Sequence, residues 1–229
     1  MSWLNDFIEL FYPGLCEACH NRLQNQEESI CTSCIYSLPQ TKFHQEKDND
    51  LSKVFAGRLH FENAVALYHF RKETKVQKLL HQLKYKGKKE IGVKLGKIYG
   101  FDLRKELSFH NIDLILPVPL HTSKQIKRGY NQSELFAKGL ALGMGIPYSS
   151  ELLLRALPSE TQTKKSKFER WKNVNEIFIV PFPEKLEQKH VLLVDDVITT
   201  GATIESCAEK LLAVSGLKIS IASIAFSGI

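Results

Sequence analysis

The sequence predicts an α/β fold, in which a mostly parallel β-sheet is covered by helices on both faces, preceded by a small cysteine-rich module. Two observations predict the sheet: short apolar runs alternate with segments of helical periodicity, and the runs are apolar throughout, as buried parallel strands are. The module is predicted because four of the five cysteines lie within the first 34 residues. We therefore expect a helix and cysteine module over residues 1–40, a linker over 41–57 and the α/β domain over 58–229.

The elements follow in order from their periodicity. Apolar residues in the first fifteen positions recur at roughly helical spacing and predict an amphipathic helix. The polar stretch Gln40–Lys53 shows no apolar periodicity, which is typical of a linker. Four apolar runs predict strands, at Ala64–Phe70, Ile112–Val118, His190–Val194 and Leu217–Phe226. Three apolar stripes predict helices, at Val76–Leu83, Leu135–Leu142 and Ile204–Leu212.

Composition limits the class of protein. The 229 residues are 43% hydrophobic and 24% charged, as in ordinary globular chains, which argues against disorder. A net charge of +6 favours anionic partners, either phosphorylated metabolites or nucleic acid. No apolar run reaches the roughly 18 residues that span a bilayer, and the N-terminus lacks the basic region of a signal peptide. We expect a cytoplasmic protein without stable membrane insertion.

The paired cysteines predict a structural zinc site. Cys16 and Cys19 form one two-residue-spaced pair, and Cys31 and Cys34 form a second. Two such pairs supply four thiolates to one tetrahedral ion, and this leaves no open coordination position for catalysis. Disulfides are disfavoured by the absence of an export signal, and unrelated thiols by the paired spacing. Cys207 stands apart, on the apolar stripe of a predicted helix, and is interpreted as a core thiol.

The segment Val191–Thr203 carries the pattern that predicts chemistry. Two carboxylates, Asp195 and Asp196, end a buried strand, and a loop of small and hydroxyl residues then leads into a helix: Thr199, Thr200, Gly201, Ala202 and Thr203. Unpaired N–H groups at a helix start bind phosphate, and acids before them can accept hydrogen bonds from ribose hydroxyls. The alternative is a helix N-cap after a solvated strand end. The order of features favours a binding site for a phosphorylated ribose.

This segment resembles the 5-phosphoribosyl 1-pyrophosphate (PRPP) signature of type I phosphoribosyltransferases, and the chain as a whole resembles the ComF family. Three further stretches support the resemblance. Phe11–Cys16, together with the paired cysteines, matches the family's N-terminal ribbon. Pro117–His121, followed by Arg128–Gln132, matches its central motif. Gln162, Glu169–Arg170 and Asn173–Val174, ending at Phe178, match the family's variable loop.

The resemblance implies a five-stranded parallel sheet with a mobile loop over the site. It implies that Asp195 and Asp196 are the catalytic acids at the ribose and that residues 199–203 hold the 5-phosphate. The pyrophosphate side would be formed by Pro119, His121, Lys124 and Arg128, with Mg²⁺ bound together with PRPP. Lys124 departs from the family, which usually carries arginine there. The family's association with natural transformation implies single-stranded DNA, a competence helicase or other DNA-uptake proteins as partners.

Basic residues concentrate before the central strand. Arg71–Lys97 holds ten Lys and Arg against two Glu, and Lys84, Lys86, Lys88 and Lys89 are candidate nucleic-acid contacts. A solvated lysine face is the alternative, and Lys84 can instead serve the substrate pocket. Two functions therefore remain open: a Mg²⁺-dependent phosphoribosyltransferase, or a non-catalytic, PRPP-responsive adaptor that binds single-stranded DNA or a competence partner.

Overall fold

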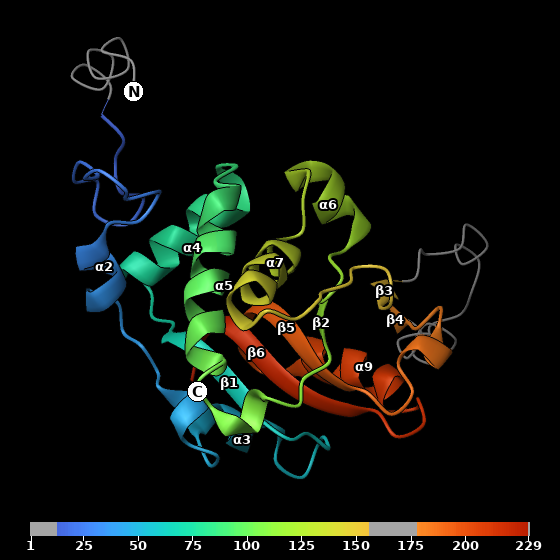
Figure 1. The fold of residues 1–229 in the computed structure, drawn as a ribbon. Helices are drawn as coiled ribbons and strands as arrows, with labels where there is room; N and C mark the ends of the chain where they lie inside the picture. Colours follow the sequence, from blue (N-terminus) through green and yellow to red (C-terminus); the bar gives the residue numbers. More distant parts are fainter. Residues whose placement is uncertain (1–12, 156–177, 229) are drawn as a thin grey trace.

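In this computed structural model, the described residues are 13–155 and 178–228 (Figure 1). The predicted N-terminal amphipathic helix lies almost entirely outside them, as do Gln162, Glu169–Arg170 and Asn173–Val174 of the variable-loop pattern. Among the described helices, none has both the length and the apolar character that crossing a membrane requires.

Four parallel strands form the central sheet. They are β1 (Ala64–His69), β2 (Leu114–Pro117), β5 (His190–Ile198) and β6 (Lys218–Phe226), in the order β1-β6-β5-β2. Each coincides with one of the predicted apolar runs, so the predicted α/β fold is confirmed. The expected fifth strand is reduced, in the described residues, to one parallel bridge between Ile115 and Tyr148. Pro147, which lacks an N–H group, immediately precedes this bridge and limits further pairing.

Helices cover both faces of the sheet. The helices are α4 (Lys75–Tyr85), α5 (Lys89–Leu103), α6 (Thr122–Arg128), α7 (Gln132–Met144) and α9 (Ala202–Leu211). The crossover through α7 leads from β2 outward to Tyr148, which pairs with the free edge of β2, away from β5. The crossover through α9 leads from β5 to β6, which lies on the other side of β5 from β2. The chain therefore moves across the sheet in opposite directions in the two crossovers. Because parallel crossovers are right-handed, these opposite directions place α7 and α9 on opposite faces. The three predicted stripes form α4, α7 and α9.

Helix α5 was not expected from the sequence. It packs side by side with α7 (Figure 1), and glycines of both helices lie at the contact. A Cβ atom added at Gly139 would overlap Val93 O, and one added at Gly96 would overlap Phe136 O. The glycines therefore allow the two backbones to approach closely. The helix also buries Ile91, Leu95, Tyr99 and Leu103 at helical spacing, so apolar periodicity was present in the sequence and was overlooked.

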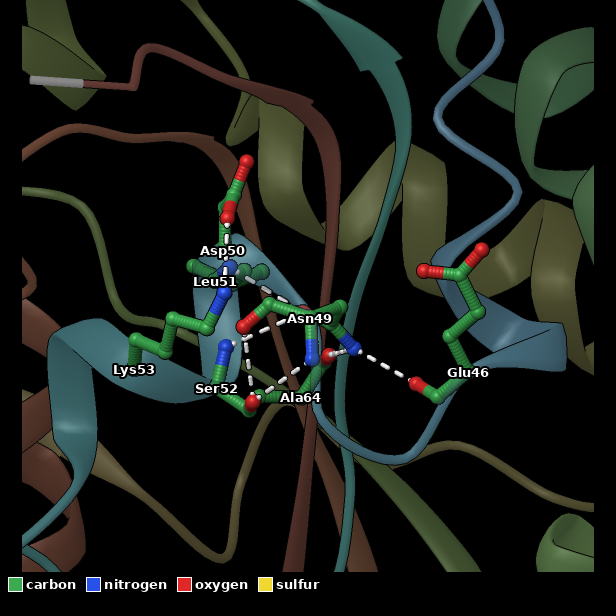
Figure 2. A network of polar contacts seen from close by, with 7 residues as sticks. All are labelled: Glu46, Asn49, Asp50, Leu51, Ser52, Lys53 and Ala64. Atoms are coloured by element: carbon green, nitrogen blue, oxygen red, sulfur yellow. Dashed lines mark hydrogen bonds and ion pairs between the residues drawn. The ribbon is translucent and has the colours of Figure 1, made fainter.

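The segment 41–57, expected as a linker, is folded and packed. It contains η1 (Phe43–Gln45) and α3 (Asp50–Phe55), and Leu51 and Phe55 are fully buried. The Asn49 side chain accepts hydrogen bonds from Leu51 N and Ser52 N and donates to Glu46 O and Ala64 O (Figure 2). One buried asparagine thus caps α3 and attaches it to β1. Its capping box with Ser52 is a short sequence signal, and it lies in a polar stretch without apolar periodicity, so α3 was not predicted.

The cysteine module precedes this segment. It comprises a bridge between Leu15 and Arg22 and the short helix α2 (Thr32–Ser37). The chain then runs along the outer edge of β1, where His69 N donates to Pro39 O and Thr41 N donates to Leu67 O. The segment that leaves the module thus pairs with β1 at one isolated bridge, between Gln40 and Tyr68, and covers backbone groups at the edge of the sheet.

Short elements complete the described chain. Two 3-10 helices, η2 (Leu107–Phe109) and η5 (Pro183–Lys185), precede β2 and β5. Strands β3 (Leu154–Arg155) and β4 (Phe178–Ile179) pair antiparallel as a separate two-stranded sheet.

Candidate functional site

The acid pair lies within strand β5, which continues past the apolar run to Ile198. Asp195 Oδ1 accepts hydrogen bonds from Ser133 Oγ and from Asp196 N, both at 2.8 Å. Removal from water, followed by the nearby charge of Asp196, raises the pKa of Asp195 to about 7. This carboxyl therefore holds its proton more tightly than a free aspartate does, and a ligand that donates hydrogen bonds or brings positive charge favours its ionised form.

Asp196 is paired with a cation from a distant helix. Lys84 Nζ, at the end of α4, lies 2.9 Å from Asp196 Oδ2, and the two side chains are 23% and 14% exposed. Lys84 was a candidate nucleic-acid contact, with the substrate pocket as its alternative. The structure places it in the pocket beside the acids.

The loop after the strand has the geometry of an anion-binding turn. Gly201 has a φ of 81°, a conformation that favours glycine, and it is the N-cap of α9. No side chain of the described residues caps this helix start, so backbone N–H groups of its first turn are available to a ligand. Thr199, Thr200, Gly201, Ala202 and Thr203 all line one small hollow together with Asp195.

A larger pocket of about 310 Å³ adjoins this hollow. Asp195, Val197 and Thr203 line both, so the two form one continuous concave surface. The predicted pyrophosphate-side residues line the pocket: Pro119, His121, Lys124 and Arg128. Sequence reasoning missed Ser133 and Arg155, which also line it. The signal for Ser133 was its position directly after the Arg128–Gln132 motif. The signal for Arg155 was its place at the start of a basic stretch, Arg155–Lys172, which has six basic residues against two acidic ones.

Buried polar contacts fix the basic wall of the pocket. Asn131 is buried at the start of α7 and donates to Val118 O at 2.9 Å, which holds the turn after β2. Arg128 donates to Gln132 Oε1 at 2.7 Å and lies over the ring of Tyr85, 5.1 Å from its centroid. Four cations and two carboxylates line the pocket: Lys84, Lys124, Arg128, Arg155, Asp195 and Asp196. The excess of positive charge suits an anion that also carries hydroxyl groups.

The remaining candidate nucleic-acid lysines have varied surroundings. Lys88 Nζ lies 2.6 Å from Glu17 Oε1 of the cysteine module, and Lys89 Nζ lies 4.9 Å from the centroid of the Tyr130 ring. Lys86 ends α4 and is exposed. The turn between α4 and α5 thus helps to hold the module through Lys88, and helix α5 does so through Lys94, whose Nζ donates to Glu28 O at 2.6 Å.

The four paired cysteines come together as the spacing predicts. The Sγ atoms of Cys16, Cys19, Cys31 and Cys34 lie within 4.8 Å of one another and form a cluster that can hold a metal ion. Cys19 Sγ and Cys31 Sγ are 3.8 Å apart. A tetrahedral ion with metal–sulfur bonds of about 2.3 Å requires sulfur–sulfur separations of about 3.8 Å. Cys207 is fully buried elsewhere, in the core, as predicted.

A second and larger cavity, of about 810 Å³, lies at the opposite edge of the sheet. Its lining includes residues at the starts of three strands, Ala64, His190 and Lys218, and none of the predicted site residues. Ligands of open parallel sheets bind at the carboxyl ends of strands. The pocket at Asp195 is therefore the candidate site.

Comparisons with known proteins identify relatives of this chain. Residues 132–228 match the family described as phosphoribosyl transferase domain. The DNA utilization protein YhgH of Salmonella typhi is 32% identical over 213 residues, covering 90% of this chain and 87% of that protein. Competence protein F of Haemophilus influenzae is 25% identical over 215 residues, covering 88% and 92%. Competence protein ComFC of Bacillus subtilis is 27% identical over 221 residues, covering 93% and 83%. Each alignment includes residues outside the matched domain.

Proposed function

The chain belongs to the ComF family, and from this membership we propose that it binds PRPP with Mg²⁺ at the carboxyl edge of the sheet and transfers the phosphoribosyl group. The observation that carries the proposal is the continuity of the acid pair, the 199–203 loop and the basic wall in one concave surface. A phosphorylated ribose with a pyrophosphate at its anomeric carbon needs all three. Each part of the ligand has a chemically matched part of the site.

The residues take distinct roles in this proposal. Residues 199–203 bind the 5-phosphate through backbone N–H groups and threonine hydroxyls. Asp195 and Asp196 accept hydrogen bonds from the ribose hydroxyls. The pyrophosphate lies against the turn at Pro119 and His121, facing Lys124 and Arg128. Bound Mg²⁺ would neutralise pyrophosphate charge, and the carboxylates and pyrophosphate oxygens are the hard ligands it prefers.

In the transfer reaction, a nucleophile bonds to the anomeric carbon as the bond from that carbon to the pyrophosphate oxygen breaks. Positive charge develops on the ribose ring, and Asp195 and Asp196 stabilise it from beneath. Negative charge develops on the leaving pyrophosphate, and Lys124 and Arg128 offset it. Lys84 links these two functions, because it contacts Asp196 and lines the same pocket.

A second function shares the same ligand. This alternative is an adaptor that binds PRPP without turnover and contacts single-stranded DNA, a competence helicase or another DNA-uptake protein. Relatives named for DNA utilization and for competence support a role connected with DNA. The exposed Lys86 and its neighbours would then contribute to a nucleic-acid surface whose affinity falls with salt. We place either activity in the cytoplasm.

The cysteine cluster is proposed to hold one structural zinc ion. Four thiolates complete a tetrahedral coordination shell, so this ion would stabilise the module and take no part in transfer.

The test combines binding with turnover. Calorimetry with PRPP and Mg²⁺ should detect binding by the wild-type protein, and the double variant Asp195→Asn/Asp196→Asn should lose it while remaining folded. Pyrophosphate release with a panel of nucleobases then separates the two functions. Release that depends on one base supports the transferase, and PRPP binding without release from any base supports the adaptor. Unchanged PRPP affinity in the double variant would contradict the ribose assignment for both.

A further inference from the structure

The 199–203 loop rests on a segment about 140 residues earlier in the chain. Phe55, at the end of α3, is fully buried, and a Cβ atom added at Gly201 would lie 2.6 Å from its Cε1. The ring therefore occupies the space that any side chain at position 201 would need. The close contact and the positive φ therefore both require glycine at position 201.

Arg58 joins three elements around this contact. Its Nη1 donates to Val54 O at 3.1 Å and to Thr200 O at 3.4 Å. Its Nη2 lies 2.7 Å from Glu205 Oε2, in the first turn of α9. The Arg58 and Glu205 side chains are 49% and 25% exposed, so this ion pair adds little to global stability. Its effect is on the position of the loop.

The Thr200 contact has a geometric consequence. The peptide bond between Thr200 and Gly201 is planar and trans, so its N–H points opposite to its C=O. Because Arg58 binds the carbonyl, the Gly201 N–H is directed away from Arg58. An anion bound in the loop needs N–H groups held in such a fixed direction.

Helix α3 is itself anchored. Asn49 is 3% exposed and donates from Nδ2 to Ala64 O of β1 at 3.0 Å, while its Oδ1 caps the helix (Figure 2). Phe55 ends this helix, and Arg58 lies in the turn directly after it, where Arg58 N donates to Phe55 O. Both residues are therefore held by a helix attached to the sheet.

We infer that Phe55 and Arg58 are positioning residues for the 199–203 loop, so that affinity for the 5-phosphate depends on the segment 49–58. This inference rests on the proposed function. It adds a determinant that lies outside the matched domain, residues 132–228, and touches no ligand atom itself.

The test compares Arg58→Met with Lys53→Met. The control removes a cation of the same 49–58 segment, from helix α3, whose partner is the exposed Asp50. Three ligands are titrated with Mg²⁺: PRPP, ribose 5-phosphate and pyrophosphate. R58M should weaken PRPP and ribose 5-phosphate by about tenfold, the effect of one charge-assisted hydrogen bond, and change pyrophosphate by less than twofold. K53M should change none, and Arg58→Lys should recover part of the loss.

Two results would overturn the inference: unchanged ribose 5-phosphate affinity in R58M, or an equal loss for all three ligands. Amide hydrogen exchange over residues 199–205 supplies a readout that needs no ligand. R58M should accelerate exchange there and K53M should not. If the wild-type protein bound no PRPP, the proposed function would fail. Faster exchange in R58M would still support positioning by Arg58, and unchanged exchange would reject it.

Discussion

Lys84 Nζ and Asp196 Oδ2, from helix α4 and strand β5, lie 2.9 Å apart at the floor of the candidate pocket. The pair couples a helix that precedes the matched domain to the acids within it. The charge of Lys84 compensates one of two adjacent carboxylates and also faces the space proposed for pyrophosphate.

Replacing Lys84 by Met should therefore affect both stability and binding. The two carboxylates lose their nearest cation, and we expect the free energy of unfolding at pH 8 to fall by about 1–2 kcal/mol. PRPP affinity should fall at least about tenfold, because a cation leaves the pocket. Denaturant unfolding and calorimetry measure these effects, and Lys86→Met is the matched control on the exposed end of the same helix. Equal behaviour of the two variants would contradict the role of Lys84.

The raised pKa of Asp195, about 7, predicts a pH-dependent stability. Since the folded state holds this proton more tightly than the unfolded state, the group's contribution to stability falls as pH rises from about 4 to about 7. Asp195→Asn removes that loss, so the variant should be more stable than wild type at pH 8 by about 2–4 kcal/mol, with the difference shrinking by pH 4. Urea unfolding at both pH values measures it. A difference independent of pH would refute the assignment.

The close contact of α5 and α7 predicts a large cost for one methyl group. Gly139→Ala places a Cβ against Val93 O, and we expect a loss of about 3 kcal/mol in the free energy of unfolding. Lys138→Ala changes the exposed neighbouring position of the same helix and should be nearly neutral. Thermal and denaturant unfolding compare the two. A tolerated G139A would show that the helices separate easily.

The cysteine cluster predicts a stability that depends on metal. Chelation should lower the Tm, and Cys34→Ser should lose the bound zinc found by elemental analysis in the wild-type protein. Cys207→Ser tests a buried cysteine outside the cluster, and it should retain the metal despite its own packing cost. Wild-type protein purified without zinc, with a Tm indifferent to chelators, would contradict the zinc proposal.

The parts of the site that are contiguous in sequence could be predicted from it. Asp195 and Asp196 follow the apolar run of β5 within the same strand, and the 199–203 loop comes directly after it, so their relative positions follow from the local chain. The contributions of Lys84 and Arg155 could not be derived in this way, because they reach the pocket from separate elements. For Lys84, the sequence left open whether the side chain contacts nucleic acid or lies in the substrate pocket.

Helices α3 and α5 were not predicted from the sequence, each for a different reason. In α5, Ile91, Leu95, Tyr99 and Leu103 recur at helical spacing on the buried face, so the apolar signal was present among the glycines and was overlooked. In α3, Leu51 and Phe55 are the buried apolar residues of a polar stretch, and Asn49 with Ser52 was the available signal. A capping box before a short helix is easily overlooked when apolar periodicity is the criterion.

The most direct measurement is a crystal structure of the protein soaked with PRPP and Mg²⁺. We expect the 5-phosphate within hydrogen-bond distance of the backbone N–H groups of residues 201–203, the ribose hydroxyls on Asp195 and Asp196, and the pyrophosphate toward Lys124 and Arg128. Density for the ligand in the 810 Å³ cavity at the amino ends of the strands, with the 199–203 loop unchanged and vacant, would contradict the account.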